Sequence, residues 1–151
     1  MLQKIQSKKI RSRGRFAIVA SKYNARYVNA MLRAAKSEII RAGGQVEIIR
    51  VPGAYEIPVV AAKLARGLRF SGIICLGVIL RGATTHAQHI GEAVSNALVQ
   101  IQIQHEVPVI HEVLLLENAQ QARERCLGRT HNRGTEAAQT ALAMARVMAA
   151  L

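Results

Sequence analysis

The sequence changes its pattern sharply within one stretch, Cys75-Leu-Gly-Val-Ile-Leu-Arg-Gly-Ala-Thr-Thr-His86. The apolar, β-branched run from Ile73 to Leu80 has the length of a strand, and it breaks at Arg81-Gly82. Helical periodicity begins at Thr85, and Gln88 follows three residues later, which is the spacing of a capping box. The stretch therefore predicts a strand, a loop and a helix, in that order.

The loop between this strand and helix predicts an anion site. The first turn of a helix has backbone N–H groups without intrahelical acceptors, and the helix dipole attracts anions to that end. His86 lies in the first turn, where an imidazole beside a bound phosphate can transfer protons. The alternatives are a simple turn at Gly82 and a solvent-exposed His86 without a catalytic role. The chain contains neither a Walker loop nor a G-x-G-x-x-G motif.

Length and composition predict a single domain. The chain has 151 residues, and 50% of them are hydrophobic, which is enough for one core. No stretch of 18 apolar residues occurs and no signal-type apolar block follows the basic N-terminus, so we expect a cytoplasmic protein that does not span a membrane. Cys75 and Cys126 have no C-x-x-C partner, so we expect buried thiols or thiols without a role, and no disulfide.

The net charge of +12 is concentrated at the start of the chain. We predict a basic arm at residues 1–14 and a single α/β domain at residues 15–151. Trp is absent and the few Tyr and Phe residues do not alternate with basic ones, so we expect no nucleic-acid binding. The arm is interpreted as a solvated segment or as an extra edge strand on a neighbouring subunit.

Strands and helices alternate along the rest of the chain. This alternation predicts an α/β three-layer sandwich, in which a four-stranded parallel sheet of flavodoxin-like order lies between layers of helices. The predicted strands are Phe16–Ala20, Val46–Val51, Ile73–Leu80 and Val107–Leu116. The predicted helices lie between Asn24 and Gly43, over Ile57–Leu68, from Thr85 through Ile101, from Asn118 to Cys126 and over Thr135–Leu151.

Ligands of such sheets bind at the carboxyl ends of the strands. That rule brings four segments to one edge, namely 21–24, 52–56, 81–86 and the end of the fourth strand. Their two tyrosine rings, Tyr23 and Tyr55, together with Glu56, His86 and the anion site, suit a polar, ring-containing substrate and a phosphate. The alternative is that both tyrosines are packing residues and that Glu56 only complements a helix N-terminus.

Two other clusters have simpler interpretations. His86, His89 and Glu92 are spaced by three residues on one helix, but the pattern is not H-E-x-x-H and only one acid is near, so we expect no metal site. The run of arginines between Arg123 and Arg133 is either a solvated helix face or a set of forks for a phosphate.

Four stretches of the chain resemble lumazine synthase, an enzyme family of riboflavin biosynthesis, in order and spacing. They are Ser-Lys-Tyr-Asn24, Pro-Gly-Ala-Tyr-Glu-Ile-Pro58, Leu-Gly-Val-Ile-Leu-Arg-Gly-Ala-Thr-Thr-His86, and Glu-Arg125 through His-Asn-Arg-Gly-Thr-Glu-Ala-Ala138. The resemblance covers about residues 15 to 150. It implies condensation of 5-amino-6-(D-ribitylamino)uracil with 3,4-dihydroxy-2-butanone 4-phosphate to 6,7-dimethyl-8-ribityllumazine, without cofactor or metal. It also implies a pentamer, sometimes assembled further into a decamer or a sixty-subunit icosahedral capsid.

The resemblance assigns a role to each matching residue. His86 is the implied proton-transfer residue, Tyr23 the ring that stacks on the pyrimidine, and Arg125 the phosphate ligand from a neighbouring subunit. The other implied phosphate-binding residues are Gly82, Ala83, Thr84 and Thr85. The other implied substrate-binding residues are Ala54, Tyr55, Glu56, Val78, Ile79, Leu80, His111 and Arg133.

Three positions depart from the family pattern. His111 stands where the family usually has Phe, Arg133 replaces the usual Lys, and Val78 replaces a hydroxyl residue found in some members. Since His86, Glu56 and Arg125 are kept, we expect the activity to be retained. The alternatives are a catalytically impaired shell or ligand-binding protein, with His111 as its marker, and a nucleic-acid-binding protein built on the basic arm.

Overall fold

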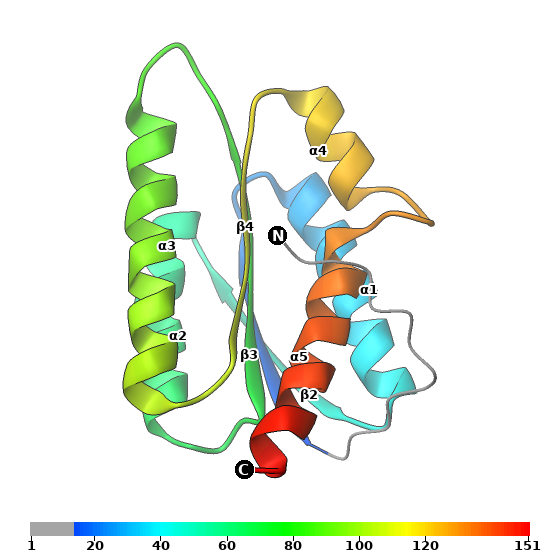
Figure 1. Cartoon of the computed structure of the whole chain (residues 1–151). Coiled ribbons are helices and arrows are strands. Elements are labelled where there is room, and N and C mark those ends of the chain that lie inside the picture. The colour runs from blue at the N-terminus through cyan, green and yellow to red at the C-terminus, as the bar shows by residue number, and fades with distance from the viewer. Residues whose placement is uncertain (1–13) are drawn as a thin grey trace.

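The structure, a computed structural model, describes residues 14–151 (Figure 1). The predicted basic arm falls outside these residues, except for Gly14, whose carbonyl accepts a hydrogen bond from the backbone of Gln45. The strands are β1 (Arg15–Ser21), β2 (Gln45–Val51), β3 (Gly72–Leu80) and β4 (Val109–Leu116). The helices are α1 (Ala25–Arg41), α2 (Ile57–Arg66), α3 (His86–His105), α4 (Ala119–Cys126) and α5 (Arg133–Ala149), and a 3-10 turn, η1 (Ala54–Glu56), precedes α2.

The four strands form one parallel sheet in the order β2-β1-β3-β4, which confirms the predicted α/β sandwich with flavodoxin-like order. The direction of strand addition reverses between β1 and β3, and such a switch point opens a crevice at the carboxyl ends of the strands. β1 pairs with β3 only as far as Ala20 opposite Leu76, whereas β4 stays paired with β3 up to Leu80. The last residues of β3 therefore have a neighbouring strand on one side only.

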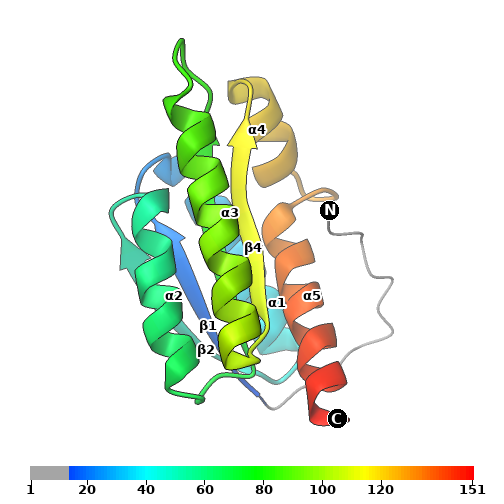
Figure 2. The same cartoon turned by 60° about the vertical axis from the view of Figure 1, so that its left-hand side comes forward.

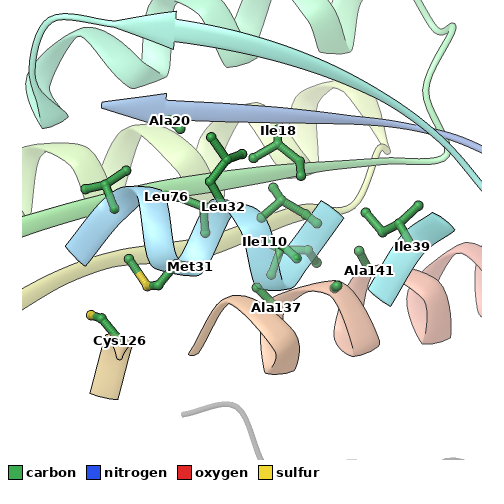
Figure 3. Close-up of a cluster of buried hydrophobic side chains, with 14 of the residues drawn as sticks. Ile18, Ala20, Met31, Leu32, Ile39, Leu76, Ile110, Cys126, Ala137 and Ala141 are labelled. Atoms are coloured by element: carbon green, nitrogen blue, oxygen red, sulfur yellow. The ribbon is translucent and has the colours of Figure 1, made fainter. Parts of the chain in front are cut away.

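Helices α1, α4 and α5 cover one face of the sheet (Figure 1). Figure 3 shows the core beneath them, where Met31 and Leu32 of α1 belong to one cluster with side chains of the sheet and of α5, such as Ile18 and Ala137. Small residues on α5 allow α1 to approach closely. A Cβ atom added at Gly134 would lie 2.0 Å from the Met31 carbonyl oxygen, so this contact requires glycine. The apolar positions predicted for α1 are all buried, namely Val28, Met31, Leu32, Ala35 and Ile39.

Helices α2 and α3 cover the opposite face (Figure 2). Alternate side chains of the same strands, such as Val19 and Cys75, form a second core with Ile57 of α2 and Leu98 of α3. Because successive side chains of a strand point to opposite faces and both faces are covered, β1 and β3 are almost continuously apolar. In the described part of the chain, no helix is long and apolar enough to cross a membrane.

Several element boundaries differ from the prediction: for example, α3 continues to His105, beyond the predicted end at Ile101, and α2 ends at Arg66. Two of the differences have a clear local cause. Helix α5 begins at Arg133, inside the predicted polar loop, because the Asn132 side chain caps it by accepting a hydrogen bond from Gly134 N at 2.8 Å. Strand β4 begins at Val109 instead of Val107, because Pro108 has no N–H to donate to a ladder.

Candidate active site

A cleft of about 1010 Å³ opens at the carboxyl ends of β1 and β3, beside η1 and the first turns of α3. It lies at the switch point of the sheet, where ligands of open α/β folds bind. Three of the four segments that the sequence predicts to meet do meet here, and they contribute most of the predicted site residues. Those that line this cleft are Tyr23, Ala54, Tyr55, Glu56, Val78, Ile79, Leu80, Gly82, Thr84 and His86.

The loop after β1 is fixed to the end of β3. Asn24 has a positive φ of 56°, a conformation that Asn tolerates better than most residues, and its Nδ2 donates a hydrogen bond to the Val78 carbonyl oxygen at 2.7 Å. That carbonyl belongs to the part of β3 that extends beyond its pairing with β1. The bond thereby orients Tyr23, the residue before Asn24, whose side chain is 73% exposed at the cleft.

The turn after β2 brings a second tyrosine and a carboxylate to the cleft. Glu56 Oε2 accepts a hydrogen bond from Gly53 N at 2.9 Å, which closes the turn η1 on itself. Glu56 is the N-cap residue of α2 but makes no side-chain capping bond there. Tyr55 stays 64% exposed. Two exposed rings at one cleft leave a large apolar surface uncovered, which a planar ligand can bury by stacking.

The loop before α3 leaves backbone N–H groups at the helix start, although the predicted capping box is wrong. Thr85 is the N-cap residue, but its side chain makes no capping bond. Gln88 instead donates to Glu92 of its own helix at 2.9 Å. Within the first turn, only the His86 N–H has a side-chain acceptor, Thr84 Oγ1, at 3.4 Å. The next N–H groups keep the unfilled donor capacity typical of a helix start.

Gly82 in this loop leaves space for a ligand. A Cβ atom built at Gly82 would meet no protein atom within 4 Å, and its φ is not in the left-handed region, so the fold itself does not require glycine there. A group bound close to the backbone would benefit from the missing side chain. His86 is exposed beside this space, while Ala83 and Thr85 lie in the same loop without lining the cleft.

A second cleft, of about 580 Å³, lies at the end of β4 between α4 and the start of α5. It contains the two predicted arginines, Arg125 and Arg133. The carboxyl end of β4 is thus at the predicted sheet edge but contributes to this separate cleft. An ion pair of 2.9 Å between Arg81 and Glu117 joins the rims of the two clefts.

Arg133 lies between two carboxylates. Its Nε lies 3.4 Å from Oε2 of Glu112, a residue of β4 that is only 1% exposed, and its Nη1 donates to Glu136 Oε2 at 2.8 Å. Burial raises the pKa of the Glu112 carboxyl to about 7, although the Arg133 charge lowers it and Glu136 raises it further. Glu112 therefore exchanges its proton near neutral pH.

His111 lines neither cleft. It is half-buried on the face of β4 that α3 covers, and its Nδ1 accepts a hydrogen bond from Val113 N at 3.1 Å. Nε2 therefore carries the proton in the neutral ring and donates to Ser95 Oγ at 2.7 Å, while Ser95 donates to the Gly91 carbonyl at 2.8 Å. In this arrangement His111 cannot act as a base toward Ser95, so the pair is not a nucleophilic dyad. Burial lowers the pKa of His111, which favours the neutral ring.

Two residues that shape the clefts are not among the predicted site residues: Asn24, which lines the first cleft, and Glu112, which lies buried behind the second. Asn24 was recognised only as part of a motif, although an Asn directly after a buried strand is a signal for a special backbone conformation. Glu112 was overlooked, although a carboxylate inside an otherwise apolar strand indicates a buried partner. Both cysteines are buried and free, as predicted, and burial raises the pKa of Cys75 to about 12 and that of Cys126 to about 11. Among residues 14–151, no three His, Cys or Glu side chains are grouped to hold a metal ion.

Comparison with known proteins identifies the family. The family model described as 6,7-dimethyl-8-ribityllumazine synthase matches residues 13–149. A protein of that name from Desulfotalea psychrophila (strain LSv54 / DSM 12343) is 37% identical over 140 residues, which cover 91% of this chain and 90% of the relative. Another, from Stenotrophomonas maltophilia (strain R551-3), is 37% identical over 137 residues, or 89% of this chain and 88% of the relative. A third, from Xanthomonas campestris pv. campestris (strain B100), is 36% identical over 137 residues and 89% of each chain. The chain therefore belongs to the 6,7-dimethyl-8-ribityllumazine synthase family.

Proposed function

We propose that the chain condenses 5-amino-6-(D-ribitylamino)uracil with 3,4-dihydroxy-2-butanone 4-phosphate to 6,7-dimethyl-8-ribityllumazine. In this reaction an amine of the pyrimidine attacks the ketone, water is lost to form an imine, phosphate is eliminated, and the ring closes with loss of a second water. Every step moves protons, and none requires a covalent bond to the enzyme.

The observation that carries the proposal is the first cleft, which combines three kinds of group. The rings of Tyr23 and Tyr55 offer stacking surfaces for the pyrimidine, and the Glu56 carboxylate can accept hydrogen bonds from ribityl hydroxyls. The loop from Gly82 to Thr85 and the first turn of α3 offer N–H groups and hydroxyls to the phosphate. Each substrate thus has its own part of the cleft.

His86 is the residue we assign to proton transfer. It lines the cleft at the start of α3, directly beyond the proposed phosphate loop, so its imidazole is close to the group that leaves. Positioning of two substrates contributes up to about 7–11 kcal/mol in favourable cases, and general acid–base help contributes about 10²–10⁴-fold. We therefore expect His86 to assist a reaction that is mainly accelerated by positioning.

We further propose that the active site is completed by a neighbouring subunit in a pentamer. Within one chain, Arg125 and Arg133 line the second cleft, away from His86 and the proposed phosphate loop. A cyclic assembly places a different surface of each subunit against its neighbour, so the second cleft of one chain can face the first cleft of the next. His111, on the edge strand of the sheet, would lie at the same boundary.

The direct test is to mix the purified protein with both substrates and follow the fluorescence of the lumazine product. The proposal is wrong if no product forms above the uncatalysed rate. The shared site is tested by mixing His86→Ala chains, whose turnover is slowed, with Arg125→Ala chains after dissociation and reassembly. Recovery of activity in the hybrids is expected, because some sites then contain both intact residues. A particle with the mass of one chain and full activity would exclude the shared site.

A further inference from the structure

Glu112 is the most deeply buried carboxylate among residues 14–151, and the reaction described above does not use it. It lies in the middle of β4, on the face that packs against α1, α4 and α5, between apolar neighbours of the first core. Burial of an ionisable group is unfavourable unless a partner compensates for it. Its presence at this position therefore requires an explanation other than core packing.

The partner of Glu112 is a residue of the proposed substrate site. Arg133 Nε lies 3.4 Å from Glu112 Oε2, and Arg133 Nη1 lies 2.8 Å from Glu136 Oε2. The contact with Glu136 is a hydrogen bond, whereas Glu112 Oε2 makes an ion pair and no hydrogen bond within the described part of the chain. One carboxylate belongs to the sheet and the other to the first turn of α5, so the guanidinium lies between negative charges from two elements. The Arg133 side chain is only 20% exposed, and the part that is exposed lines the second cleft.

Arg125 provides a contrast within the same cleft. It is exposed on α4, and Gln121 of its own helix accepts from its Nη1 at 3.4 Å. A side chain held by one neutral neighbour on its own helix retains more rotamer freedom than one held between two carboxylates. Of the two arginines, Arg133 is therefore the one whose geometry is fixed before a ligand arrives.

We propose that Glu112 and Glu136 are positioning residues for Arg133, and that together they hold its guanidinium in the orientation that contacts the pyrimidine substrate. The inference rests on the proposed function, since it takes Arg133 as a substrate-binding residue. Holding a donor in its bound orientation lowers the entropy lost on binding. Loss of either carboxylate should therefore weaken binding of the ribitylaminouracil, while the phosphorylated substrate and the turnover number change little.

The proposal also gives substrate binding a specific pH dependence. The groups of the described chain that influence Glu112 are Arg133 and Glu136 on α5 and Cys126 on α4. Arg133 stays charged, and burial keeps the Cys126 thiol neutral with a pKa of about 11. Because burial raises the pKa of Glu112 to about 7, its carboxylate attracts Arg133 at pH 8 but is mostly neutral at pH 6.

The test compares wild-type protein with Glu112→Gln between pH 6 and 8.5, with both substrates varied. At pH 8.5 we expect Glu112→Gln to raise KM for the ribitylaminouracil about threefold to tenfold, the effect of losing roughly 1 kcal/mol of binding energy. At pH 6 the two proteins should have nearly equal KM. The ratio of the KM of Glu112→Gln to the KM of wild type at each pH is independent of the titration of the substrates, because the substrates titrate equally in both assays. Glu136→Gln should raise the same KM at every pH.

Three controls separate this inference from its alternatives. Glu47→Gln removes an exposed carboxylate of β2, and we expect it to leave KM unchanged. In an Arg133→Lys background, Glu112→Gln should add little, because coupled residues are not additive. Wild-type protein that makes no lumazine would contradict the proposed function. Active wild-type protein with a pH-independent KM ratio near one would leave that function intact and overturn the positioning role of Glu112.

Discussion

Replacing Glu112 by Gln should stabilise the protein at alkaline pH, although it removes one member of a buried ion pair. In the folded chain, burial raises the pKa of Glu112 from 4.5 to about 7. Between these values the folded state holds a proton that the unfolded state has released. The wild-type free energy of unfolding should therefore fall as the pH rises from about 4.5 to about 7, and stay low above it.

The size of this effect follows from the pKa shift. One pKa unit corresponds to about 1.36 kcal/mol, so the rise from 4.5 to about 7 predicts a loss of up to about 3 kcal/mol between pH 4.5 and pH 8. Gln resembles the protonated carboxyl in size and in having no charge. The two proteins should therefore have similar stability near pH 5, and the variant should be more stable by up to about 3 kcal/mol at pH 8.

Urea unfolding at pH 5, 6, 7 and 8 measures this difference, with the protein concentration held constant because assembly contributes to apparent stability. Glu47→Gln serves as the control for loss of one negative charge at an exposed position. The prediction is wrong if Glu112→Gln is less stable than wild type at pH 8, or if the difference in stability between the two proteins is the same at pH 5 and pH 8. Either result would mean that Glu112 is ionised throughout and that its attraction to Arg133 exceeds the penalty of burial.

The remaining predictions concern catalysis and helix packing. His86→Ala should slow turnover by about one to two decades without lowering the unfolding temperature, since the side chain is exposed. His105→Ala, at the far end of α3, is the matched control. Equal turnover in the two variants would remove His86 from the mechanism. Arg125→Lys should raise KM for the phosphorylated substrate and leave KM for the ribitylaminouracil nearly unchanged, because Lys lacks the planar guanidinium. Steady-state kinetics with each substrate varied would measure this; an equal rise in both KM values would indicate a structural role for Arg125. Gly134→Ala should lower the free energy of unfolding measured in urea by more than about 3 kcal/mol, because its Cβ would lie 2.0 Å from the Met31 carbonyl oxygen. Gly91→Ala is the control: its Cβ would lie 3.6 Å from Leu115, and the variant should be neutral or stabilised by up to about 1 kcal/mol. Similar values for the two variants would contradict the close contact of α1 and α5.

The fold class could be predicted from the sequence because apolar strands alternate with helices along the whole chain. Strands β1 and β3 are covered on both faces and are therefore continuously apolar, and α1 repeats its apolar positions at helical spacing, so both kinds of element were recognisable locally. The apolar repeat predicts a start of α5 that is too late, because the Asn132 side chain determines where the helix begins.

The site was predictable only as far as it follows strand ends. Tyr23, Glu56 and His86 each come shortly after a strand, and the switch-point rule was enough to bring them to one cleft. Arg133 and Glu112 are far apart in the sequence, and their ion pair depends on how α5 packs against β4. No local pattern contains that information. The sequence also does not predict that the site residues divide between two clefts, since this depends on which strand forms the edge of the sheet.

Strand β3 continues beyond its pairing with β1, and this affects which mutations at its end the protein can tolerate. Beyond Leu76, one edge of β3 faces the first cleft without a neighbouring strand, and Asn24 occupies the Val78 carbonyl. A ring with amide-like edges can bind such a strand through main-chain N–H and C=O groups, much as an added strand would. These N–H and C=O groups belong to the main chain, so they do not depend on which side chain a residue carries. A substitution at Val78 therefore leaves the main-chain N–H and C=O groups that β3 offers to a ligand in place.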